Sequence, residues 1–250
     1  MNDRVTKLRQ TVSSGKYPIC TEKHRLITES FKQTERQPEI LRNALAFAHV
    51  LDNITIFIED GELIVGNAAS KPNGVEFGDL NGLWTDQEID GLKEDEGFTI
   101  SEEDEAELRS WQSYWKGKTM TARMAQLFEN QDLWQFVQLG IVLPAWKGTK
   151  EDAERGGAIA GSGMAVSPEF GSILVAPDFE KILCYGLNSV IEEAEHELSK
   201  TKLIDNEAFE KSDFLRSVII ANKAVLRFAA RFADLASNLV RTESDPVRKK

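Results

Sequence analysis

Cysteine is scarce in this chain, which contains only Cys20 and Cys184 among its 250 residues. The two stand far apart, with neither a CxxC pair nor a nearby histidine pair, so the sequence offers no disulfide framework and no zinc-ligand spacing. Two isolated thiols fit a reducing compartment, and we expect a cytoplasmic protein. The three histidines (His24, His49 and His196) all fall in helical patterns, and we interpret them as structural or surface residues rather than metal ligands.

Long apolar runs and excess positive charge are also missing. No stretch reaches the ~18 uninterrupted apolar residues of a membrane span, and the opening MNDRVTKLRQ lacks the apolar run of a secretory signal. The formal net charge is −11 and the sequence pI is about 4.9. A polyanion would repel such a chain, so neither nucleic acid nor a membrane surface is an expected partner.

Most of the chain carries the hydrophobic periodicity of α-helices. Apolar residues recur three and four positions apart in segments that glycine, proline and polar clusters separate. The predicted helices cover residues 3–13, about 20–36, 38–53, the region of 111–115, 119–128, 177–194 and, as the longest at about 50 Å, 205–240. Near the end of the chain, Asp245 and Pro246 look like the start of a further helix.

Residues 86–107 form an acidic tract with eleven carboxylates and one lysine. The pairs Thr85 with Glu88 and Ser101 with Asp104 have the spacing of helix-capping residues, and acidic groups in a first turn complement the helix dipole. The glycine and terminal glutamate of an EF-hand do not occur in order. We therefore predict solvated helices here rather than a cation site.

The hydrophobic period changes to two after residue 53. In NITIFIEDGELIVGN, isoleucines recur at every second position (Ile54, Ile56 and Ile58), the pair Asp60 and Gly61 interrupts them, and a second apolar run follows. The Asp-Gly pair tolerates the positive φ of a tight hairpin turn. The sequence thus predicts a β-hairpin over residues 54–66 and a fold that is mainly α with this small hairpin.

The stretch GGAIAGSGM, residues 156–164, has four glycines in nine positions. A P-loop would need a lysine after the second glycine, but Ser162 and Gly163 follow, and no strand–glycine–helix pattern of a dinucleotide site surrounds the stretch. No GxSxG elbow is present either. Glycine allows close approach of the backbone, so a pocket wall and a packed loop remain open, and a nucleotide-binding module rests on the glycines alone.

Residues 18–67, PICTEKHRLITESFKQTERQPEILRNALAFAHVLDNITIFIEDGELIVGN, resemble the N-terminal signature of the glycyl radical enzymes of the pyruvate formate-lyase-like family. That signature has an I-C-x-E-R-A helix, so Lys23 and His24 replace the usual arginine and alanine. Two later pieces are also similar to the family, SYWKGKT at residues 113–119 and PDFEKILCYGL at residues 177–187.

The resemblance implies a ten-stranded α/β barrel wrapped by helices in the full-length protein. In the family, a glycyl radical takes a hydrogen atom from a cysteine, and the thiyl radical then attacks the substrate. Neither Cys20 nor Cys184 matches that cysteine, and Arg4-Val5 continues as Thr6-Lys7, unlike the radical loop. We therefore expect residues 1–250 to be the N-terminal portion of this domain, without catalytic residues, bound cofactor or metal, and inactive alone.

The resemblance also indicates a substrate-binding segment. In the family the chain before the PDFEK-like helix approaches the substrate, so residues 156–171 are the expected pocket segment. Its expected lining residues are Ser162, Met164, Ser167 and Phe170. Apolar side chains there favour an aromatic or apolar substrate, and the connection SKPNGVEF with GLW is similar to the arylacetate-decarboxylase branch. Dehydratase and C–C lyase reactions are the alternatives within the family.

The expected partners follow from the same resemblance. They are a radical-SAM activating enzyme that installs the glycyl radical, a second copy in a full-length homodimer, and a small-molecule substrate of anaerobic metabolism. A non-catalytic helical scaffold or interaction protein derived from this fold is the alternative function.

Overall fold

The computed structural model describes residues 3–13, 15–60, 62, 64–67, 69–76, 86–94, 97–119 and 178–246. The chain forms two units, one made of Met1–Gly78, Trp84–Trp111 and Glu180–Lys250, the other of Asp79–Leu83 and Gln112–Phe179. Most of the second unit falls outside the described residues, so the elements below are those of the first unit unless stated. The first unit is mainly helical with a small parallel sheet.

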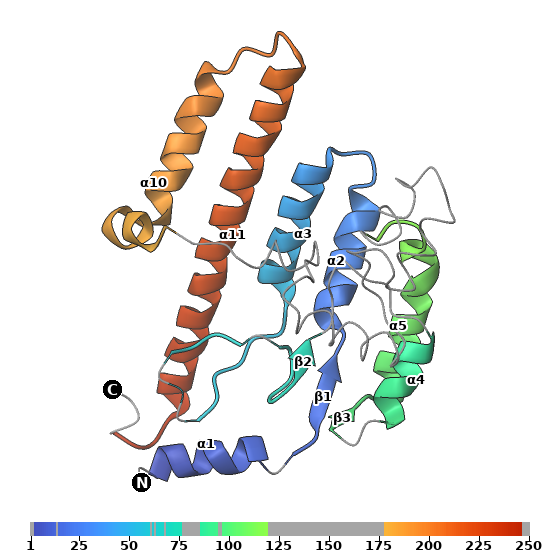
Figure 1. The fold of residues 1–250 in the computed structure, drawn as a ribbon. Helices are drawn as coiled ribbons and strands as arrows, with labels where there is room; N and C mark the ends of the chain where they lie inside the picture. The colour runs from blue at the N-terminus through green and yellow to red at the C-terminus, as the bar shows by residue number, and fades with distance from the viewer. Residues whose placement is uncertain are drawn as a thin grey trace, which may run out of the picture. The chain divides into compact units, whose positions relative to one another are not determined.

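The described helices confirm most of the periodicity-based predictions (Figure 1). They are α1 (Asp3–Ser13), α2 (Glu22–Gln33), α3 (Glu39–Asn53), α4 (Asp86–Glu94), α5 (Glu102–Trp115), α10 (Phe179–Lys200) and α11 (Asn206–Thr242). Pro38 precedes α3 at its N-cap position instead of lying in its first turn. The predicted helix over 119–128 and the continuation after residue 246 lie outside the described residues. No helix in the described segments has the length and apolar character needed to cross a membrane.

Helix α3 lies between α2 and α11 (Figure 1). Its buried residues are Ala44, Ala46, Ala48 and Val50. Small side chains allow neighbouring helix backbones to approach closely, and two neighbours bury more than one stripe. For this reason Ala46 and Val50 are buried as well as Ala44 and Ala48, while Ile40 near the start of the helix is exposed.

Two arginines of α11 hold the C-terminal end of α3. Arg227 forms a bidentate ion pair with Asp52, with Nε 2.8 Å from Oδ1 and Nη2 2.7 Å from Oδ2. Arg231 donates to the main-chain oxygens of Leu51 and Ile54. The last carbonyls of a helix lack partners within the helix, so the Arg231 guanidinium supplies donors at its negative end.

The sheet has three short parallel strands in the order β2-β1-β3. Strand β1 (Tyr17–Cys20) is central, with β2 (Val75–Glu76) and β3 (Phe98–Thr99) at its edges. Ile19 and Cys20 are fully buried. The helix predicted from about residue 20 therefore begins at Glu22, because the residues just before it enter the sheet.

The predicted hairpin over residues 54–66 is wrong, since none of the described residues in this range lies in a strand. The Asn67 side chain bonds to main-chain groups that a hairpin would pair with another strand. Its Nδ2 donates to Thr55 O at 3.0 Å, and its Oδ1 accepts from Phe57 N at 3.4 Å. Ile64 is 91% exposed. Alternation fixes a strand only where one face is buried, and here part of the apolar pattern faces no core.

The acidic tract forms α4 and α5, as predicted, and arginine and lysine neutralise part of it. Arg109 of α5 pairs with Asp86 and Asp90 of α4 and with Glu105 one turn earlier on α5. Lys93 of α4 lies 2.9 Å from the same Glu105 carboxylate. The tract therefore joins two helices through shared ion pairs, a network that contributes more than isolated surface pairs do.

Candidate functional site

The four predicted pocket residues, Ser162, Met164, Ser167 and Phe170, lie outside the described residues, as does the whole segment 156–171. Their assignment to a substrate pocket stays a prediction. What the structure does describe is a group of polar and charged side chains at the N-terminal end of α2, of which Thr21 belongs to the signature of residues 18–67. We call this group the signature cluster, and it consists of Thr21, Lys71, Glu76, Asp104 and Glu107.

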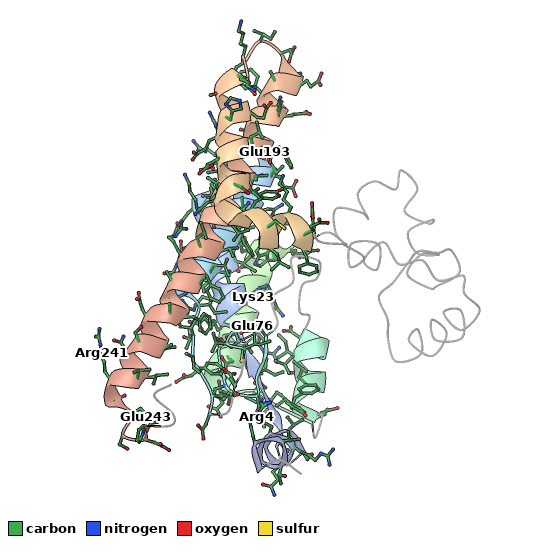
Figure 2. The ribbon with its side chains drawn as sticks, turned by 90° about the vertical axis from the view of Figure 1, so that its left-hand side faces the viewer. Arg4, Lys23, Glu76, Glu193, Arg241 and Glu243 are labelled. Carbon is green, nitrogen blue, oxygen red and sulfur yellow. The ribbon has the colours of Figure 1, made fainter. Side chains whose placement is uncertain are left out.

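Glu76 caps helix α2 from a strand 53 residues further along the chain. Its Oε1 accepts a hydrogen bond from Lys23 N at 2.7 Å, close to the helix N-terminus (Figure 2). Its Oε2 accepts from Ser70 N at 3.2 Å and from Ser70 Oγ at 3.1 Å. A carboxylate at this position satisfies an amide that has no partner within the helix and complements the positive end of the helix dipole.

Thr21, the N-cap residue of α2, does not cap its own helix with its side chain. Its Oγ1 instead lies within donating distance of two carboxylates of α5, 2.9 Å from Asp104 Oδ1 and 3.1 Å from Glu107 Oε2. The side chain is buried, so these carboxylates satisfy a hydroxyl that water does not reach. Glu76 thus caps α2 in place of Thr21. The Thr21 side chain instead joins the start of α2 to α5.

Asp104 is the centre of the cluster. Lys71 Nζ lies 2.6 Å from its Oδ2 and 3.1 Å from the Ile19 carbonyl oxygen, so this lysine joins β1 to α5. Asp104 N also donates to Ser101 Oγ at 3.1 Å, which confirms the predicted capping pair. Burial alone would raise the pKa of Asp104, but the hydrogen bonds from Lys71, Ser101 and Thr21 outweigh it, and the pKa lies below its ordinary value.

The pKa of Glu107 is shifted in the opposite direction from that of Asp104. Burial is the main cause that raises the pKa of Glu107, and the nearby negative charges of Asp104 and Glu29 act in the same sense. Arg25 Nε, at 3.5 Å, and the Thr21 hydroxyl offset only part of this effect. On acidification Glu107 is therefore expected to take up a proton before Asp104.

Cys20 lies beside the cluster as a buried thiol. Its Sγ is 3.8 Å from the Pro18 carbonyl oxygen, and burial raises the pKa of the thiol above its ordinary value. Gly74 passes so close that a Cβ atom there would lie 2.5 Å from Cys20 Sγ. A buried thiol with a raised pKa stays protonated at neutral pH, so the structure gives Cys20 a packing role and not that of a thiolate nucleophile.

The histidines of the described segments also have structural environments. His24 is buried against Trp111, with ring centroids 5.0 Å apart, and burial lowers its pKa to about 4. His49 Nε2 lies 3.3 Å from Glu29 Oε2, and His196 is exposed on the surface of α10. In the parts of the chain that the structure describes, no three His, Cys, Asp or Glu side chains are grouped to hold a metal ion.

Within the described residues, the signature cluster therefore works as an anchor. It ties the start of α2 to β1, β2 and α5 through the Lys71–Asp104 ion pair and through the hydrogen bonds of Thr21 and Glu76. The sequence analysis missed Lys71, Glu76 and Glu107, which lie in a polar connection and in an acidic helix without distinguishing periodicity. The one available signal was the threonine between the buried strand and α2, because a hydroxyl at a predicted helix start calls for a hydrogen-bond partner.

Comparison with known proteins agrees with the signature. The family model of pyruvate formate lyase-like proteins matches residues 1–250. The chain belongs to the pyruvate formate lyase-like family of glycyl radical enzymes. An isethionate sulfite-lyase of Oleidesulfovibrio alaskensis is 31% identical over 254 residues, which cover 99% of this chain and 29% of the relative.

Solved structures of family members show the same fold. The glycerol-bound B12-independent glycerol dehydratase of Clostridium butyricum superimposes with a TM-score of 0.80 at 32% identity, covering 100% of this chain and 29% of that chain. An indoleacetate decarboxylase of Tractidigestivibacter scatoligenes is less similar, at 22% identity over 260 residues. The present chain thus spans 29% of the length of the sulfite-lyase and of the glycerol dehydratase.

Proposed function

We propose that this chain is the N-terminal part of a glycyl radical lyase that eliminates a small group, such as water or sulfite, from a small organic substrate. The observation that carries the proposal is the 31–32% identity to a sulfite-lyase and a glycerol dehydratase, which extends over essentially the whole chain and covers 29% of each relative.

The identities favour elimination over decarboxylation. The connection near residues 70–84 suggested the arylacetate-decarboxylase branch, but the indoleacetate decarboxylase is 22% identical, whereas the sulfite-lyase is 31% identical over a similar length. The dehydratase-like alternative is therefore the better supported reaction. An aromatic substrate rests only on the apolar residues of the expected pocket segment.

In this proposal, residues 1–250 supply part of the helical layer around a ten-stranded barrel, and the signature cluster fixes α2 in that layer. Ser162, Met164, Ser167 and Phe170 contribute to the pocket wall. The polypeptide that follows Lys250 carries the cysteine and the radical glycine, which a radical-SAM enzyme activates, and the full-length protein is a cytoplasmic homodimer. The 250-residue chain alone is inactive.

A product assay tests the reaction class. The protein encoded by the reading frame that continues past Lys250 is activated anaerobically and incubated with short hydroxylated, sulfonated and arylacetic acids. We expect release of water or sulfite, and none from residues 1–250 alone. Carbon dioxide from the arylacetic acids would instead place the protein with the decarboxylases. A folded, activated protein that turns over none of these substrates would support the non-catalytic scaffold.

A further inference from the structure

Helix α10 bends sharply at Gly186. This glycine has φ 74° and ψ 172°, a conformation that side chains with a Cβ rarely adopt, and it separates residues 180–185 from the rest of the helix. We call residues 180–185 the arm. Lys181 on the arm lies 2.6 Å from Glu193 beyond the bend, and Ser189 Oγ donates to the Gly186 carbonyl oxygen at 2.8 Å. The arm is thus held in a defined direction relative to the longer part of α10.

The arm exposes large apolar side chains. Leu183 is 83% exposed, Tyr185 is 73% exposed and Ile182 is 37% exposed. Leu183 and Tyr185 belong to the most exposed large apolar residues in the described segments. Large apolar side chains that are exposed on a backbone held by an ion pair across the bend indicate a surface that packs against another polypeptide.

Charge argues against a second copy of this chain as the occupant. Glu180 on the arm and Glu192 and Glu193 beyond the bend are exposed carboxylates, and Lys181 is already paired with Glu193. A twofold contact would place each arm against the same acidic surface of the other copy. Like charges brought together in this way oppose association.

We propose that the arm docks against the polypeptide that follows Lys250 in the full-length protein. This inference rests on the proposed function, because it takes the chain as part of a longer glycyl radical enzyme. The whole of the present chain matches only 29% of the glycerol dehydratase chain. The rest of such a protein is a much longer polypeptide than residues 1–250. The apolar side chains of the arm offer it a preformed surface to pack against.

The two cysteines of the chain make the test direct. Cys184 lies on the arm between Leu183 and Tyr185 and is exposed, whereas Cys20 is buried. The measurement is the rate of maleimide labelling at each cysteine, resolved by peptide mass spectrometry, in residues 1–250 and in the protein extended past Lys250. We expect Cys184 to react at least about 10-fold more slowly in the extended protein, as a thiol shielded from reagent does. Cys20 should react slowly in both proteins and serves as the internal control.

The other possible occupants give different results. Protection of Cys184 in residues 1–250 that increases with protein concentration would identify a second copy. Protection that is independent of concentration would assign the cover to another part of the same 250 residues. Equal labelling in the two proteins would show that the arm stays uncovered. Each of these three results overturns the proposal.

A pair of matched variants tests the contact itself. Leu183→Asp adds a carboxylate to the arm, and Asn188→Asp adds one at an exposed position just past the bend. In the extended protein, Leu183→Asp should restore most of the Cys184 labelling rate, and Asn188→Asp should leave the protection unchanged. Equal effects of the two variants would contradict docking through the arm. Circular dichroism of residues 1–250 carrying each substitution verifies that the helices persist.

Docking and catalysis fail in distinguishable ways. If the extended protein protects Cys184 but forms no radical after activation, docking stands and the proposed function is wrong. If it forms a radical while Cys184 stays fully reactive, the proposed function stands and docking of the arm is wrong.

Discussion

At the scale of single residues, the signature cluster is a partly buried polar anchor. Glu76 receives hydrogen bonds from Lys23 N, Ser70 N and Ser70 Oγ. Glu76→Gln keeps the shape but removes the charge and one acceptor oxygen, so it should lower the free energy of unfolding by about 1–3 kcal/mol. Urea denaturation of residues 1–250 measures the change. The control Glu94→Gln, at an exposed position of α4, should stay within about 0.5 kcal/mol of the parent; equal losses would contradict the capping role.

His24 predicts a pH dependence of stability. Its folded-state pKa of about 4 lies below the ordinary histidine value of 6.5, so the unfolded chain binds the proton more strongly. The resulting stability is fully present above pH 6.5 and is lost as the pH falls toward 4, by about 2–3 kcal/mol in total. The carboxylates of the signature cluster titrate in the same range. The measurement is therefore the difference in urea-unfolding free energy between the parent and His24→Gln, at pH 7.5 and at pH 4.5.

The parent should lose more stability than His24→Gln between these two pH values. A matched pH dependence of the two proteins would show that the imidazole is not buried in its neutral form.

Gly74 is limited by its neighbours. A Cβ atom would lie 2.5 Å from Cys20 Sγ and 2.8 Å from the Lys71 carbonyl oxygen. Gly74→Ala should therefore destabilise residues 1–250 by about 1–3 kcal/mol, as other overpacking changes do. Adding Cys20→Ala removes the sulfur but not the carbonyl contact, so the double variant should recover part of the loss. Thermal unfolding of the three proteins decides, and an unchanged melting temperature for Gly74→Ala would refute the close approach.

At the scale of elements, α11 depends on long-range contacts with α3. Arg231 donates to the last carbonyls of α3, and the side chain of Arg216, in contrast, is mostly exposed and lies 3.9 Å from Asp213 on its own helix. Arg231→Met should lower the unfolding free energy by about 1–3 kcal/mol, and Arg216→Met should change it by less than about 0.5 kcal/mol. Guanidinium denaturation measures the unfolding free energy of both variants. Equal effects would contradict a stabilising role for the hydrogen bonds from Arg231 to the end of α3.

The helices could be predicted from the sequence because their signals are local. Asp205 was expected near the start of the longest helix, and its Oδ1 accepts from Ala208 N at 2.9 Å. Strand β1 could not be predicted, since four residues with both faces buried show no period. The hairpin was predicted from a pattern that a strand and an irregular segment share. Only the tertiary position of Asn67 distinguishes them.

The anchor residues escaped prediction for a related reason. Lys71 and Glu76 act on β1 and α2, which lie about fifty residues earlier in the chain. Nothing in their immediate sequence encodes that contact. The pocket prediction, by contrast, came from resemblance alone, and Ser162, Met164, Ser167 and Phe170 remain expected lining residues that the described structure does not test.

At the scale of the whole molecule, the chain has the fold of one part of a much larger protein. It matches the glycerol dehydratase structure over its full length and 29% of that chain, and it carries exposed apolar side chains on α10. Both features agree with a layer that supports catalytic parts encoded elsewhere. We therefore propose that the radical chemistry lies outside residues 1–250 and that these residues have structural and pocket-forming roles.

The most direct test of this account is electron paramagnetic resonance of the protein extended past Lys250, after anaerobic activation by a radical-SAM activating enzyme. The account predicts an organic glycyl radical that is absent from residues 1–250 treated identically, and a radical yield that parallels lyase activity. A correctly folded extended protein without any radical, or lyase activity in the 250-residue chain alone, would contradict it.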